Sequence, residues 1–62
     1  MGAIVQVCEY RVGGIRFYDI TYSNGRTLTC TPSTLSRFAV RFMKEAGYTE
    51  DTGTMIVYRK AA

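Results

Sequence analysis

The chain contains no histidine, only one proline and only two cysteines among its 62 residues. Without histidine, a cysteine lacks the base that most often turns a thiol into a nucleophile. Two cysteines by themselves cannot fill the four ligand positions of a structural zinc site. We therefore expect no enzymatic activity, no bound metal and no other cofactor, and no small-molecule substrate is evident.

Long apolar runs are also missing. No stretch approaches the roughly 18 apolar residues of a membrane span, and the first residues have neither the basic start nor the apolar core of a secretion signal. We expect a cytoplasmic protein without a membrane partner. A chain this short forms one domain over residues 1–62, and such a domain buries only about 60% of its unfolded surface. Proteins of this size often gain stability from a second subunit.

Three segments rich in β-branched and aromatic residues are predicted strands: residues 3–12, 15–23 and 26–31. The dipeptides between them, Gly13-Gly14 and Asn24-Gly25, are typical of two-residue hairpin turns. Residues 54–60 are predicted to form a last strand, which follows a polar connection over residues 48–53.

One helix is predicted after the third strand. Thr31 suits the N-cap and Pro32 the first helical position, and Gly47 is placed to end the helix. Between them an apolar stripe recurs at helical spacing, formed by Leu35, Phe38, Ala39, Phe42, Met43 and Ala46. The predicted fold class is α+β, a small antiparallel sheet with one helix on one face, in the order β-β-β-α-β.

Two-residue turns predict the register of the sheet. They place Tyr10 opposite Phe17 and put Asp19 opposite both Cys8 and Cys30. Because side chains alternate between faces, one face holds Ile4, Cys8, Tyr10, Val12, Ile15, Phe17, Leu28 and Cys30. The other face holds Val5, Val7, Tyr18, Ile20 and Tyr22.

A single short helix can cover only one of these faces. We expect the core to lie under Phe38 and Phe42, and the aromatic-rich face with Tyr18 and Tyr22 to be free for binding. The alternative is a β-bulge near Phe17-Tyr18. Such a bulge would bring Ile15, Phe17, Ile20 and Tyr22 onto one face and leave the other polar.

In the same register, Cys8 and Cys30 lie on the two strands that flank the central one. Their separation is then nearly twice the 4.8 Å spacing of neighbouring strands, which is too far for a disulfide. We expect two free thiols, as suits a reducing compartment. Asp19 between them should raise their pKa by repulsion between like charges.

The formal net charge of +3 comes from eight basic and five acidic residues. Arg37, Arg41 and Lys44 should form a basic ridge on the helix, opposite its apolar stripe. Arg11 and Arg16 should face each other beside the Gly-Gly turn, where like charges destabilise a strand pair. An acidic or phosphate-bearing partner at that point would relieve the repulsion. The alternative is that these are ordinary solubilising charges.

The function expected from these features is that of a non-enzymatic protein-binding module, a small inhibitor or adaptor that also forms a homodimer. In size and architecture the chain resembles phage-encoded inhibitors of host defence such as anti-CRISPR proteins, although no motif supports that likeness. A nucleic-acid-binding module that uses its basic sheet or helix surface is the alternative, and a subunit of a larger assembly is a third possibility. The partner-binding residues we expect are Tyr18, Tyr22, Arg11, Arg16, Arg37, Arg41 and Lys44.

Overall fold

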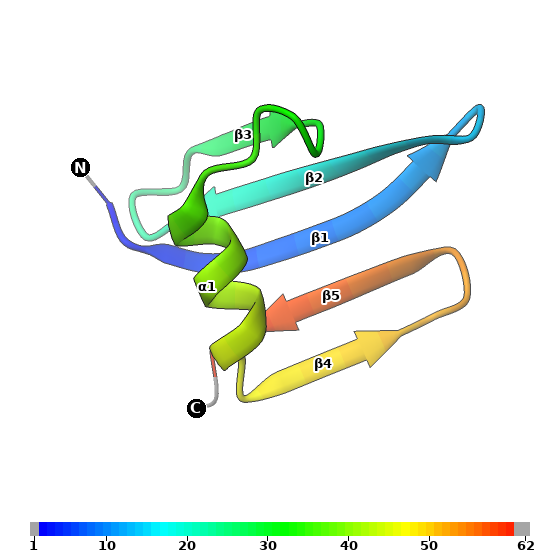
Figure 1. The fold of residues 1–62 in the computed structure, drawn as a ribbon. Helices are drawn as coiled ribbons and strands as arrows, with labels where there is room; N and C mark the ends of the chain where they lie inside the picture. Colours follow the sequence, from blue (N-terminus) through cyan, green and yellow to red (C-terminus); the bar gives the residue numbers. More distant parts are fainter. Residues whose placement is uncertain (1, 61–62) are drawn as a thin grey trace.

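One helix packs against one face of a five-stranded antiparallel sheet, which confirms the predicted α+β class (Figure 1). The computed structural model describes residues 2–60. Along the chain the elements are β1 (Ile4–Val12), β2 (Ile15–Tyr22), β3 (Thr27–Cys30), α1 (Arg37–Glu45), β4 (Tyr48–Asp51) and β5 (Met55–Arg59). The strands lie side by side in the order β3-β2-β1-β5-β4, so β1 forms the centre of the sheet.

The predicted element order is wrong at residues 48–51, which form strand β4 rather than a polar connection. This strand pairs with β5 from Tyr48↔Arg59 to Asp51↔Ile56, and Gly53 in the turn has a φ of +91°. All four residues of β4 are exposed because the strand lies at the edge of the sheet. An edge strand can be polar throughout, so it has no apolar alternation by which it could be recognised.

The hairpin of β1 and β2 follows the prediction. Gly13 and Gly14 have φ values of +59° and +80°, as a type I′ turn requires. Cys8 lies opposite Asp19 and Tyr10 opposite Phe17. The bulge suggested near Phe17-Tyr18 is absent. The irregularity lies instead between Ile4 and Gln6, where Ile4 rather than Val5 is paired with Tyr22.

The turn between β2 and β3 differs from the prediction, and the difference changes the register. The amide of Gly25 donates to the carbonyl of Tyr22 (2.9 Å), and the amide of Tyr22 donates to the carbonyl of Arg26 (2.9 Å). Gly25 has a φ of +87°, and none of the described residues other than glycine has a positive φ. These contacts describe a three-residue loop in which a type I turn is followed by a glycine bulge. The extra loop residue moves β3 by one position, so Cys30 lies opposite Tyr18 and Thr29 opposite Asp19.

The helix is shorter than predicted and begins at Arg37. Ser36 is its N-cap, with a side-chain oxygen that accepts a hydrogen bond from the amide of Ala39 (3.2 Å). Thr31, the predicted cap, instead forms a turn in which its carbonyl accepts from the amide of Thr34 (3.0 Å). At the other end, Ala46 is already extended, with φ −60° and ψ 129°.

The core lies between α1 and one face of the sheet, which we call the covered face. Its buried residues are Val7, Tyr18, Ile20, Cys30 and Ala39, with Ile4, Tyr22, Leu35, Phe42, Met43 and Tyr58 packed around them. The predicted role of Phe42 is confirmed, but that of Phe38 is wrong because its side chain is 65% exposed. Phe38 precedes the fully buried Ala39 by one residue, about 100° around the helix, so it points away from the sheet.

Candidate functional site

The face of the sheet opposite α1, which we call the open face, carries a group of apolar side chains. Register pairs place Met55, Tyr10 and Phe17 in one row across β5, β1 and β2, with Val12 and Ile15 in the next row. The rings of Tyr10 and Phe17 stack, with centroids 5.8 Å apart and planes at 25°. Val12 and Ile15 are 60% and 57% exposed. We call these five residues the apolar patch.

Polar contacts hold the aromatic ring of Tyr10 in place. Its hydroxyl donates to the Asp19 carboxylate (3.0 Å), and the hydroxyl of Thr29 donates to the same oxygen (2.9 Å). The hydrogen bond to Asp19 raises the pKa of Tyr10 above its ordinary value, with smaller contributions from burial and from the Asp19 charge. The carboxylate therefore has two donors, and the ring beside it has a restricted orientation.

Cys8 lies on the open face next to Asp19, whereas Cys30 is buried on the covered face. Both are free thiols, as predicted. The predicted alignment of the two with Asp19 is correct only for Cys8, because the register change moves Cys30 to the other face. Burial raises the pKa of the Cys8 thiol, and the Asp19 charge raises it further. A thiol kept protonated in this way is a poor nucleophile.

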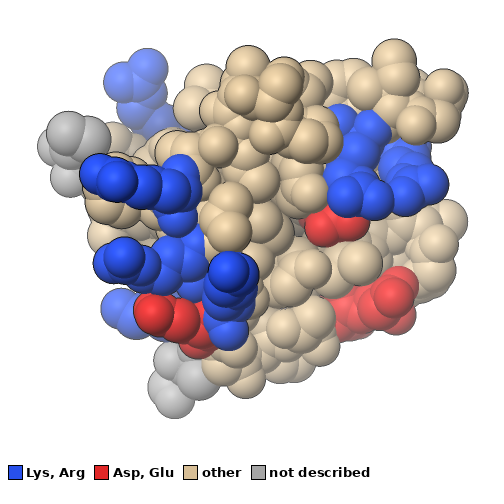
Figure 2. Space-filling view, viewed as in Figure 1, with Lys and Arg blue, Asp and Glu red and all other residues tan. Residues whose placement is uncertain are grey.

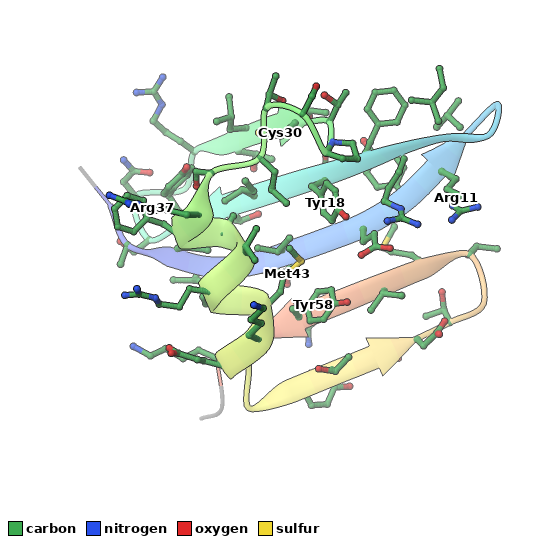
Figure 3. All side chains as sticks on the ribbon, viewed as in Figure 1. Arg11, Tyr18, Cys30, Arg37, Met43 and Tyr58 are labelled. Carbon is green, nitrogen blue, oxygen red and sulfur yellow. The ribbon has the colours of Figure 1, made fainter. Side chains whose placement is uncertain are left out.

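The prediction that Tyr18 and Tyr22 lie on a free face is wrong. Tyr18 is 6% exposed, and Tyr22 packs against the core. Figure 3 shows Tyr18 and Tyr58 on the same side of the sheet as α1, with Met43 of the helix above that face. The alternation had grouped Tyr18, Ile20 and Tyr22 correctly, but α1 covers their face and leaves the face of Tyr10 and Phe17 open.

Arg11 and Arg16 face each other across the β1–β2 hairpin, as predicted. Glu9, two residues before Arg11 on the same face, approaches Arg16 with 3.6 Å between its Oε2 and the arginine Nε. That ion pair supplies within the chain the negative charge that we expected from a partner. Both arginines project on the covered side of the sheet, beyond the reach of α1, and Arg11 lies near the hairpin turn (Figure 3).

The predicted basic ridge is present on α1. Arg37, Arg41 and Lys44 are exposed and line one shallow groove together with Glu45. In Figure 2 basic side chains gather at this end of the molecule, away from the second basic group beside the hairpin. The ridge belongs to the helix layer, so the sheet separates it from the apolar patch.

The structure thus brings together a set of residues different from the one predicted. None of the five patch residues was among the predicted partner-binding residues. The signal that could have identified the open face is its polar content. Asp19, Thr27 and Thr29 all belong to it once β3 has its actual register, and antiparallel sheets usually turn their more polar face to water.

Comparisons of the chain with protein-family models, with curated proteins and with solved structures find no match. Within residues 2–60 no three metal-binding side chains gather in a way that could hold a metal ion. No helix within the same residues is long and apolar enough to cross a membrane.

Proposed function

We propose that this chain is a non-catalytic protein-binding module whose partner docks on the open face of the sheet. The observation that carries the proposal is the apolar patch, since an uncovered sheet face is normally polar. Contiguous exposed apolar side chains mark interaction sites more often than free surface. Aromatic residues such as Tyr10 are enriched among the residues that dominate binding energy.

The geometry of Tyr10 supports this proposal. Its ring is stacked on Phe17 and its hydroxyl is held by Asp19 (3.0 Å), so little side-chain freedom remains to be lost when a partner binds. Preorganisation of this kind lowers the entropic cost of association. Tyr10 and Phe17 are therefore the residues we expect to contribute most to partner affinity.

The distribution of charge favours a protein over a nucleic acid as the partner of this face. No arginine or lysine lies in the apolar patch, and the Asp19 carboxylate lies beside it, 3.0 Å from the Tyr10 hydroxyl. Arg11 and Arg16 lie on the opposite side of the sheet. Nucleic-acid affinity depends largely on phosphate neutralisation by basic residues. Among the strand residues of the open face only Arg59 is basic, and its side chain already donates to Gln6 (2.9 Å). With one small binding face, the module would act by occupying its partner's surface, as an inhibitor or adaptor of the phage-encoded anti-defence type.

Affinity capture with two matched variants tests the proposal. Ile15→Lys places a charge in the apolar patch, and Phe38→Lys makes the same kind of change on the helix. The two residues are 57% and 65% exposed, so neither change should disturb folding. Tagged wild-type chain and both variants are incubated with a nuclease-treated lysate of the source cells. Partner affinity is then measured with the purified captured protein.

We expect wild type and Phe38→Lys to retain one stoichiometric protein partner, and Ile15→Lys to bind it at least about tenfold more weakly. Loss of binding in Phe38→Lys with full binding in Ile15→Lys would move the site to the helix. Capture that disappears after nuclease treatment would replace the protein partner with a nucleic acid.

A further inference from the structure

The two edges of the sheet differ in charge. Strand β4 at one edge carries Glu50 and Asp51, whereas β3 at the other consists of Thr-Leu-Thr-Cys and carries no charge. Edge strands present unpaired backbone groups, and natural proteins often protect such edges with charged side chains. Because β3 lacks this protection, its outer edge can accept another strand.

The hydrogen-bond pattern shows which backbone groups of β3 point outward. The amide of Tyr22 donates to the carbonyl of Arg26 (2.9 Å), which makes Tyr22 and Arg26 a hydrogen-bonded pair. Such pairs alternate along an antiparallel ladder with pairs that are not hydrogen-bonded. Leu28, opposite Ile20, therefore directs its N–H and C=O toward β2, and Thr27 and Thr29 direct theirs away from the sheet.

We propose that β3 pairs with β3 of a second copy of this chain, antiparallel and centred on Leu28, to form a continuous sheet across a two-fold axis. In this register Thr27 of each copy faces Thr29 of the other, so all the outward backbone groups of these residues find partners. Leu28 faces Leu28 in the non-hydrogen-bonded pair, where side chains approach most closely. A two-fold interface must be self-complementary in this sense.

The side chains agree with this register. Leu28 is 52% exposed on the covered side, beyond α1, and lines a shallow hollow with Tyr22 and Arg26. In the dimer, Leu28 of the second copy would cover this exposed Leu28 side chain. Arg26 faces Cys30 of the other copy, so no like charges oppose each other. At the other edge, the same reasoning puts Glu50 opposite Glu50 in a symmetric pair, which is unfavourable.

Neighbouring symmetric registers would form fewer backbone hydrogen bonds, because some of the amides that they need are already in use. A pair centred on Thr29 would need the amide of Thr31, which donates to the hydroxyl of Thr34 (3.0 Å). A pair centred on Thr27 would extend to Gly25, whose amide donates to the carbonyl of Tyr22 (2.9 Å). The dimer goes beyond the proposed function and does not rest on it. It would join two apolar patches in one assembly, which strengthens binding to a partner that has two sites.

Sedimentation velocity of the full chain, from about 10 μM to about 1 mM, tests the proposal, since an interface this small is expected to be weak. We expect wild type to shift from monomer toward dimer over this range, and Leu28→Thr to do the same. Leu28→Asp should remain monomeric because two carboxylates would face each other. In the dimer, amide hydrogen exchange should slow at Thr27 and Thr29, while Leu28 is protected even in the monomer.

Two proline variants provide the matched control, because both remove an amide that points away from the sheet and proline is tolerated at such edge positions. Thr27→Pro removes an outward amide from β3 and should abolish dimerisation. Thr49→Pro removes an outward amide from β4 and should leave dimerisation intact. Wild type that stays monomeric at 1 mM would overturn the proposal, as would a dimer that survives both Leu28→Asp and Thr27→Pro. If Thr27→Pro does not fold, the oligomeric state of Leu28→Asp tests the proposed dimer by itself. Ile15→Lys should still dimerise, because Ile15 lies outside β3. A failure of the proposed partner site on the apolar patch and a failure of the proposed β3 dimer therefore give different results.

Discussion

Ile15 and Ile20 lie on the same strand but on opposite faces of the sheet, and they provide a direct comparison of those faces. Ile20 is 1% exposed and packs in the core with Val7 and Ala39, whereas Ile15 is 57% exposed. Truncation of a buried isoleucine to alanine costs about 2–5 kcal/mol, because transfer free energy is lost and a cavity remains. An exposed site usually changes stability by no more than about 0.5 kcal/mol.

The whole domain should be stable by only about 3–9 kcal/mol, from 62 residues at about 0.05–0.15 kcal/mol each. Ile20→Ala therefore removes a large share of the stability, and Ile15→Ala very little. In urea unfolding followed by circular dichroism, a slope near 1 kcal/mol/M converts the expected loss for Ile20→Ala into a midpoint lower by about 2 M or more.

If Ile20→Ala does not fold, Ile20→Val serves in its place, with an expected cost of about 0.5–1.5 kcal/mol. Equal losses in Ile15→Ala and Ile20→Ala would refute the assignment of faces. A larger loss in Ile15→Ala would mean that the helix covers the side of the sheet we describe as open.

Three further predictions concern the helix cap and the titrating groups beside the patch. Ser36→Ala should lower the free energy of unfolding by about 1 kcal/mol, and Ser36→Gly by only a few tenths, as measured by thermal melting. The pKa of Tyr10 is raised because its hydroxyl donates a hydrogen bond to Asp19. This hydrogen bond therefore stabilises the fold fully below pH about 10, the ordinary pKa of tyrosine. The contribution is lost as pH rises through the pKa of Tyr10 in the folded chain. Asp19→Ala should lower the Tyr10 pKa in an ultraviolet phenolate titration, and an unchanged value would contradict the assigned cause. Because burial and Asp19 raise the pKa of Cys8, Asp19→Asn should speed alkylation of that thiol by iodoacetamide at pH 8.

The β1–β2 hairpin could be predicted from the sequence because its turn is locally determined. Gly13 and Gly14 both adopt positive φ at little cost, and this geometry specifies a two-residue loop and thereby the register. Given that register, alternation sorted Val7, Tyr18 and Ile20 from Tyr10 and Phe17 correctly.

The second hairpin shows why the rest could not be predicted. Asn24-Gly25 suits a type I′ turn, but glycine also suits the bulge position after a type I turn, and the latter is what forms. The single-residue change in register moves Leu28 and Cys30 to the covered face. The predicted register assigned Cys30 to the face of Tyr10 and Phe17, and Thr27 and Thr29 to the face of Tyr18 and Ile20. With these assignments the two faces were about equally apolar. Which of them the helix covers then depends on packing over the whole sheet, and local sequence does not report it.

Hydroxyl-radical footprinting of the purified complex would show whether the partner occupies the open face of the sheet. Tyr10, Phe17 and Met55 report on the apolar patch, and Phe38, the most exposed of the chain's large apolar side chains within the described residues, reports on the helix. We predict that partner binding protects the three patch residues from oxidation and leaves Phe38 as reactive as in the free chain. Protection of Phe38 with unchanged oxidation of Tyr10, Phe17 and Met55 would contradict the account.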